Sequence, residues 1–193
     1  MKLYKEMFEK WMNSEVVDEG TKQELMTLAG NDAELEGRFS SMLDFGTAGL
    51  RGTMGAGLHK MNVYTVRYAT QGLSDLILAN GEEAARRGVC IAYDSRIHSQ
   101  DFAWEAACTL SANGISVYLF DELRPTPELS FAIREFGAIA GINVTASHNP
   151  KEYNGYKVYW EDGAQLPPQH AKQISDRLSE IDIFADVKTC SRE

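Results

Sequence analysis

Long apolar runs and a surplus of basic residues are both missing from this sequence. No apolar run approaches the roughly 20 residues that a helix needs to cross a bilayer. The chain starts with MKLYKEMFEKW, which lacks the continuous apolar segment of a secretory signal peptide. The formal net charge is −9, whereas a general nucleic-acid binder needs a basic surface. We therefore expect neither a membrane nor a nucleic acid as a partner.

Cysteine is scarce, and its spacing suits neither a disulfide framework nor a metal site. The three cysteines, Cys90, Cys108 and Cys190, are odd in number and widely separated in the sequence. No two of them have the short spacing that is typical of metal ligands. We therefore predict reduced, mostly buried thiols in a cytoplasmic protein.

A nucleotide-binding phosphate loop is also absent, although glycine is locally abundant. Residues 45–57, FGTAGLRGTMGAG, contain five glycines in thirteen positions. This abundance indicates turns and close backbone approaches. No Gly-Lys-Ser/Thr follows Gly55 and Gly57, so the stretch is not a Walker A loop and nucleotide binding is not expected.

The sequence does contain an alternation of strand-like and helix-like segments. Apolar residues recur at helical spacing up to Ala79, with Asn62 as the expected N-cap and Asn80-Gly81 as the end. Apolar runs predict strands, and periodic stretches between them predict helices. The strands are expected at 89–93, 115–120, 138–144 and 155–160, and the later helices at 102–113, 126–136 and 169–181. This alternation is typical of a three-layer α/β/α domain with a mixed, largely parallel sheet.

The first 40 residues differ from the rest because they show only helical patterns. Apolar side chains near the start share one helical face, and two shorter helices are expected at 22–29 and 33–38. We therefore divide the chain into an N-terminal helical extension, residues 1–40, and an α/β domain, residues 41–193.

Three polar segments directly follow predicted strands: Asp94-Ser95-Arg96, Arg124-Pro125-Thr126-Pro127 and Thr145 to Pro150. In parallel sheets ligands bind at the edge where the carboxyl ends of the strands meet. The sequence therefore predicts a functional site at that edge, built from these segments.

The last of these segments contains a serine suited to covalent chemistry. Residues 145–157 read TASHNPKEYNGYK. Small residues precede Ser147, so we expect its hydroxyl to project from a loop, and nearby cations such as His148 and Lys157 could balance developing negative charge. For a Ser-His pair by itself, an ordinary polar turn is the alternative interpretation.

This longer string resembles the phosphoserine signature of the α-D-phosphohexomutase family, which includes phosphoglucomutases and phosphomannomutases. The resemblance continues at residues 45–52, at Tyr93 to Arg96 with Ser99, and at Pro125-Thr126-Pro127, in the order that the family has them. It covers roughly residues 40 to 183. The GTAGLR form and the helical lead look most like the phosphoglucomutase/phosphopentomutase branch.

The resemblance implies roles for individual residues. Ser147 would be the phosphoserine that donates a phosphoryl group to a phosphosugar and takes it back from a bisphosphorylated intermediate. Arg51 and Lys157 would bind substrate beside the transferring group and assist proton transfer, which for Lys157 requires a lowered pKa. His148 would orient the loop or a sugar hydroxyl. Purely structural roles for Arg51, His148 and Lys157 stay open, and Arg96 is expected to hold neighbouring loops together.

The resemblance also implies a cofactor and further domains. Mg²⁺ would bind the phosphate oxygen on Ser147 and neutralise phosphoryl oxygens, with a bisphosphorylated sugar as primer. The family's other metal ligands lie in an Asp-Gly-Asp-x-Asp-Arg loop, which this chain lacks. The family's later, C-terminal domains would be the partners of this domain, and the chain alone is expected to show little turnover.

The implied function is a mutase that moves phosphate between C1 and C6 of a hexose phosphate, or C1 and C5 of a pentose phosphate. The alternative is a non-catalytic sugar-phosphate-binding or regulatory relative, which would have no use for a phosphorylated Ser147. A serine hydrolase is disfavoured because no Gly-x-Ser-x-Gly elbow occurs. The sequence leaves the preferred sugar open.

Overall fold

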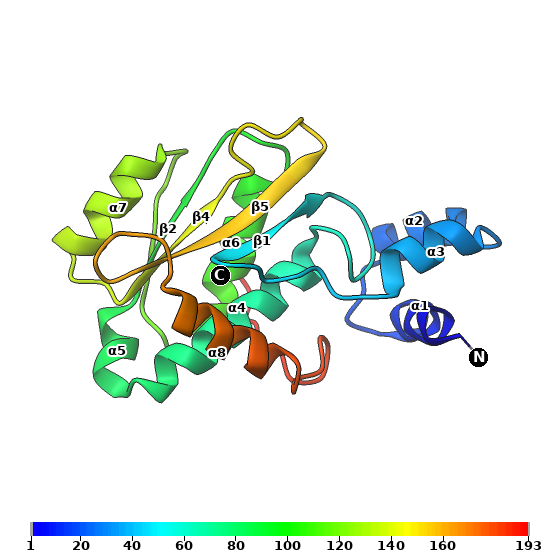
Figure 1. Ribbon diagram of the computed structural model, residues 1–193, viewed down its shortest axis with the longest axis horizontal. Helices are drawn as coiled ribbons and strands as arrows, with labels where there is room; N and C mark the ends of the chain where they lie inside the picture. The colour runs from blue at the N-terminus through cyan, green and yellow to red at the C-terminus, as the bar shows by residue number, and fades with distance from the viewer. Residues whose placement is uncertain (1, 193) are drawn as a thin grey trace.

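A five-stranded mixed sheet forms the centre of the structure, a computed structural model that describes residues 2–192 (Figure 1). Its strand order is β1-β5-β4-β2-β3. The bounds are β1 Gly49–Thr53, β2 Val89–Tyr93, β3 Val117–Leu119, β4 Ala140–Val144 and β5 Tyr153–Trp160. Strand β2 pairs in parallel with β3 and β4, whereas β5 is antiparallel to β4 and β1. The sheet is therefore mixed and largely parallel, as predicted.

Helices cover both faces of this sheet (Figure 1). Helix α6 (Ser99–Ala112) packs on one face, with α4 (Val63–Ala79) beside it and α8 (Pro168–Leu178) against α4. Helix α7 (Thr126–Glu135) packs on the other face, over β2 and β4. The short α5 (Glu82–Arg87) follows α4. The predicted three-layer α/β/α arrangement is confirmed.

Burial on both faces explains the sequence of the central strands. All five residues of β2 and all five of β4 are buried. Such strands are near-continuous apolar runs instead of alternating patterns. On the α7 side, a Cβ at Gly141 would stand 2.4 Å from Ile133, so the glycine lets α7 approach the sheet closely.

Three helices precede the sheet: α1 (Leu3–Asn13), α2 (Glu19–Thr27) and α3 (Asp32–Phe39). Helix α1 packs against α3 and α2, and it reaches the start of α4 through Tyr64. Trp11 is completely buried, and its ring meets Phe39 at 5.6 Å, Tyr64 at 5.1 Å and Phe184 at 5.4 Å between centroids. These aromatic contacts join α1, α3, α4 and the C-terminal segment into one apolar cluster. The division into two domains at residue 40 stays a prediction.

Element ends depart from the predicted ends where polar residues interrupt an apolar pattern. Helix α6 begins at Ser99, three positions before the predicted start at Phe102. The apolar pattern did not reveal this earlier start because residues 99–101 are polar. Strand β3 is shorter than predicted, and it lies at the edge of the sheet. Helix α5 was not predicted. None of the helices within residues 2–192 is long and apolar enough to cross a membrane.

Candidate functional site

An open hollow of about 550 Å³ lies where strands β2 and β4 end. Two of the three predicted polar segments supply most of its lining, together with two neighbouring residues. The lining residues are Asp94, Ser95, Arg96, Ile97, Ser147, Asn149 and Lys151. The predicted meeting of these two segments at the carboxyl edge of the sheet is therefore observed.

The third polar segment lies beside this hollow without lining it. The Arg124 amide donates a hydrogen bond of 3.1 Å to the Tyr93 carbonyl. The Thr126 hydroxyl accepts one of 2.7 Å from the buried side chain of Asn143. These bonds attach the segment to the ends of β2 and β4, which gives it a structural part in the site.

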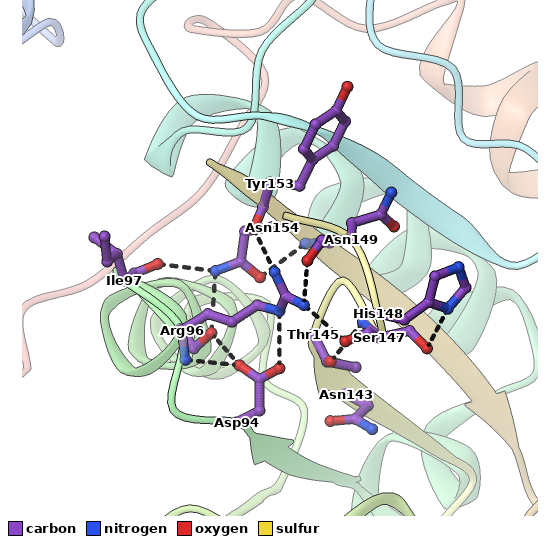
Figure 2. Close-up of polar contacts among 12 residues, drawn as sticks. Asp94, Arg96, Ile97, Asn143, Thr145, Ser147, His148, Asn149, Tyr153 and Asn154 are labelled. Carbon is purple, nitrogen blue, oxygen red and sulfur yellow. Dashed lines mark hydrogen bonds and ion pairs between the residues drawn. The ribbon is translucent and has the colours of Figure 1, made fainter. Parts of the chain in front are cut away.

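Ser147 is an exposed residue in a tight turn directly after β4 (Figure 2). Its backbone is left-handed, with φ 57°, which is rare for a residue other than glycine. The Ser147 amide donates a hydrogen bond of 3.0 Å to the Thr145 hydroxyl, which closes the turn. Because Thr145 and Ala146 are buried while Ser147 is exposed, the turn lifts the hydroxyl out of the sheet edge, as the sequence predicted.

His148 is exposed and lies directly beside the Ser147 hydroxyl. Its Nδ1 is 3.4 Å from the Ser147 Oγ, a long hydrogen bond whose donor depends on the imidazole tautomer. No base–acid pair of the hydrolase kind extends from it, since within residues 2–192 no carboxylate is hydrogen-bonded to His148. The contact suits a residue that orients the serine or a substrate hydroxyl.

Arg51 and Lys157 lie on neighbouring strands and on the same face of the sheet. In the β1–β5 register Arg51 stands opposite Gly155, and Gly49 stands opposite Lys157. The two cationic residues are therefore diagonal neighbours, which lie about 7–8 Å apart in such a ladder. Both line a second open hollow, of about 470 Å³, together with the glycine-rich segment 44–50.

One hydrogen bond connects this cationic pair to the serine turn. Arg51 Nη1 donates to the Asn149 side-chain oxygen over 3.2 Å. Among the residues that the structure describes, neither Arg51 nor Lys157 has a direct hydrogen bond to Ser147. The structure thus brings Ser147 and His148 into contact and joins Arg51 to the same turn, while Lys157 lies beside Arg51 on the same face of the sheet.

Two glycines make this close arrangement of strands and turn possible. Gly49 has φ 138°, and a Cβ there would stand 1.8 Å from the Tyr156 carbonyl oxygen. At Gly155 a Cβ would stand 2.6 Å from the Thr145 carbonyl oxygen. Both obstacles are backbone atoms, so no side-chain adjustment could relieve them.

The sequence alone did not show which asparagines support the site. Asn154 is fully buried in β5, where its side chain donates bonds of 3.0 Å to Ile97 O and Ser99 Oγ. Asn149 lies in the serine turn and is the partner of Arg51. The apolar residues that follow Asn154 in the sequence could have indicated that it belongs to a buried strand.

The residues that the structure describes do not form a complete Mg²⁺ site. Within residues 2–192 no group of three or more His, Cys, Asp or Glu side chains could hold a metal ion. Mg²⁺ prefers oxygen ligands in octahedral geometry. The Ser147 oxygen by itself does not provide them, so the described residues supply at most one ligand of such a site.

Residues 42–183 match the family model of phosphoglucomutase/phosphomannomutase, alpha/beta/alpha domain I. The chain belongs to this family. The match includes Arg51, Ser147, His148 and Lys157, and it begins close to the predicted start of the α/β domain.

Curated relatives include proteins named phosphopentomutase, phosphoglucomutase and glucose 1,6-bisphosphate synthase. A mouse phosphopentomutase is 40% identical over 177 residues, which are 89% of this chain and 28% of the relative. A Staphylococcus saprophyticus phosphoglucomutase is 42% identical and shares 78% of this chain and 27% of its own length. A mouse glucose 1,6-bisphosphate synthase is 42% identical over 83% of this chain and 27% of its own. The chain thus spans less than a third of the length of these relatives.

Solved structures share the fold. A Thermus thermophilus protein, thought to be a phosphomannomutase, aligns with a TM-score of 0.67 at 28% identity, over 78% of this chain and 32% of that one. A phosphoglucomutase/phosphomannomutase family protein of Burkholderia thailandensis aligns with a TM-score of 0.60 at 24% identity, over 78% and 32%. At that identity the second likeness bears on the fold alone.

Proposed function

We propose that this chain is the phosphoryl-carrying domain of a phosphosugar mutase and that Ser147 is the carrier. The observation that supports this most is the geometry of the turn. An exposed serine hydroxyl stands on a left-handed turn at the carboxyl edge of the sheet, beside His148, on a loop bonded to Arg51. The family membership and the mutase names of the relatives support the same assignment.

The proposed reaction is a pair of phosphoryl transfers. In the first, a phosphosugar hydroxyl oxygen bonds to phosphorus while the bond between phosphorus and Ser147 Oγ breaks. The hydroxyl proton passes to a base, for which Lys157 is the candidate, with Arg51 beside it on the same face of the sheet. The Ser147 oxygen that leaves takes up a proton from the same group and becomes a hydroxyl. In the second transfer, Ser147 Oγ bonds to the other phosphorus of the bisphosphorylated sugar while the bond between that phosphorus and the sugar oxygen breaks, and the serine proton passes through the base to that oxygen. The phosphate has then changed position and the serine phosphate is restored.

Local cations make this transfer plausible in an acidic protein. A phosphoserine carries about −1.5 to −2 charges at neutral pH. The whole chain carries −9, so the compensating charge must be local. Arg51 supplies such charge beside the turn, with Lys157 and His148 close by, and Mg²⁺ would add to it when ligands from outside residues 2–192 complete its site.

The direct test is phosphorylation of Ser147. The chain is incubated with Mg²⁺ and glucose 1,6-bisphosphate or ribose 1,5-bisphosphate, and the site of phosphate is located by peptide mass spectrometry. We expect phosphate on Ser147 and none in a Ser147→Ala variant. Well-folded wild-type protein that stays unphosphorylated with every donor would contradict the proposal and favour a non-catalytic sugar-phosphate-binding relative.

Turnover tests the complete function. The chain is assayed by itself and together with the family's C-terminal domains, with glucose, mannose, N-acetylglucosamine and ribose 1-phosphates as substrates. We propose turnover of a pentose or glucose phosphate that Ser147→Ala abolishes, and little turnover by residues 1–193 alone. Appreciable turnover by the shorter chain would contradict the second part.

A further inference from the structure

The guanidinium of Arg96 donates hydrogen bonds to the backbone of the serine turn (Figure 2). Its Nη2 donates hydrogen bonds to the carbonyls of Ser147, over 2.7 Å, and Asn149, over 2.8 Å. Its Nη1 donates to the carbonyls of Pro150, over 3.0 Å, and Tyr153, over 3.2 Å. One side chain thus holds four carbonyl oxygens of the segment from Ser147 to the first residue of β5.

Arg96 is itself held by a chain of polar side chains that runs from half-buried Asp94 at the end of β2 to buried Ser99 and Asn154. Its Nε faces the Asp94 carboxylate at 3.3 Å, and the Asp94 Oδ1 accepts a bond of 2.8 Å from the Ser99 hydroxyl. The Ser99 oxygen in turn accepts a bond of 3.0 Å from the buried side chain of Asn154 in β5. The orientation of the guanidinium is therefore set by two strands and the start of α6.

These contacts use the four N–H groups on the two Nη atoms of the side chain. A guanidinium has five N–H groups in a fixed planar fork. The four Nη groups match the four carbonyl oxygens, Nε forms an ion pair with the Asp94 carboxylate, and only 15% of the Arg96 side chain is exposed. No Nη donor is left for a phosphate, although the residue borders the hollow. The geometry is that of a support, not of an anion-binding arginine.

The turn needs such a support because Ser147 is strained. A left-handed backbone is unfavourable for serine, and such conformations persist only where surrounding contacts impose them. The Ser147 carbonyl, which Arg96 holds, is part of the peptide unit whose rotation would relax the turn. Relaxation would carry the hydroxyl away from His148 and from its place in the hollow.

We infer that Arg96 is a positioning residue for phosphoryl transfer, which holds Ser147 in the left-handed conformation that presents its hydroxyl. The role in phosphoryl transfer rests on the proposed function of Ser147. The claim that Arg96 holds the conformation of Ser147 can be tested separately. A lysine cannot replace this arginine, because an ammonium with three donors cannot reach four carbonyls and a carboxylate at once.

The first measurement is nuclear magnetic resonance of the isotope-labelled chain as wild type, Arg96→Lys and Arg96→Ala. In both variants we expect the Ser147 Cα and Cβ shifts to leave the left-handed range and the amide signals of residues 145–154 to move or broaden. Added guanidinium should restore the wild-type shifts in Arg96→Ala, and added ammonium should not. Unfolding curves identify any variant that has lost its fold.

Arg87→Ala is the matched control. Arg87 also donates to two backbone carbonyls, of Gly137 and Ala138, and pairs with Glu161 at 2.8 Å, but it precedes β2 at the opposite end of that strand. We expect its replacement to leave the Ser147 shifts unchanged. If Arg96→Lys and Arg96→Ala also leave them unchanged in folded protein, the positioning role is wrong.

The second measurement is the rate of Ser147 phosphorylation over a range of bisphosphorylated-sugar concentrations. A positioning residue predicts a maximal rate at least tenfold lower in Arg96→Lys, with a half-saturating concentration within twofold of wild type. If the maximal rate is unchanged and only the half-saturating concentration rises, Arg96 binds substrate and the inference is overturned. Failure of the wild type to become phosphorylated refutes the proposed function instead, and the shifts alone then decide the structural role.

Discussion

Arg51 donates a hydrogen bond of 3.2 Å to the side chain of Asn149, 98 positions later in the chain. The bond joins β1, at one edge of the sheet, to the turn that carries Ser147. It links the cationic face of β1 and β5 with the nucleophilic turn, two features that the sequence presents separately. Its removal tests whether the two act as one site.

Replacing Asn149 by alanine should slow phosphorylation of Ser147 about tenfold, or about 1.4 kcal/mol of activation free energy, because Arg51 loses the bond that holds it beside the serine turn. The free energy of unfolding should change by less than about 0.5 kcal/mol, since the bond is exposed and the Asn149 backbone bonds remain. Rate assays and urea unfolding measure the two effects. An unchanged rate would mean that Arg51 does not depend on this partner.

Gly49→Ala should be severely destabilising, by about 3 kcal/mol or more, because a Cβ there would overlap the Tyr156 carbonyl oxygen at 1.8 Å in a backbone of φ 138°. Gly37→Ala is the control. Gly37 lies in helix α3 with nothing within 4 Å of an added Cβ. There alanine should stabilise by about 0.5–1 kcal/mol through helix propensity. Equal effects of the two substitutions in urea unfolding would contradict the close approach of β1 and β5.

Asp18 should make the stability of the protein depend on pH below about 4. Burial by itself would raise the pKa of its carboxyl, but hydrogen bonds from Thr21 and Tyr64 outweigh burial and lower the pKa to about 2. Since the folded pKa lies below the unfolded one, the stabilisation is complete above the unfolded value near 3.9 and is lost as the pH falls toward 2.

Asp18→Asn measures this contribution because asparagine can still cap α2. The variant should be less stable than wild type by about 1 kcal/mol at neutral pH, a value reduced from the full linkage because the side chain is exposed to solvent. The difference should shrink as the pH falls from about 4 to about 2. A difference that is the same at both ends of this range, measured by urea unfolding, would argue against the charged cap.

The cysteines should differ sharply in reactivity toward iodoacetamide. Burial in β2 raises the pKa of the Cys90 thiol to about 11, so almost no reactive thiolate forms near neutral pH. Burial and the neighbouring Cys190 raise the pKa of Cys108 as well. The exposed Cys190 should therefore label first, as mass spectrometry of peptides would show. In Cys190→Ser the fast phase should vanish, and rapid native labelling of Cys90 would contradict its burial.

Local signals carried much of the fold. The capping box of Asn62 and Thr65 and the terminal Asn80 are short-range features, and α4 lies where they predict it. The central strands were visible because burial on both faces requires continuous apolar runs. Strand β1 has no such run, since it lies at the edge and holds glycines whose need arises only from its partner β5. Helix α5 is six residues long, too short to show a period.

The features of the candidate site also divide into those that are local in the sequence and those that depend on the tertiary structure. The sequence by itself determined that a serine follows a buried strand within a string typical of phosphohexomutases, because both facts are local in the chain. Only the tertiary structure decided that Arg51 bonds to Asn149, that Asn154 is buried, and that Arg96 holds four carbonyls of the serine turn. The residues that those contacts join are separated by 51 to 98 positions in the sequence. The geometry of the contacts depends on strand order and register, which no local pattern encodes.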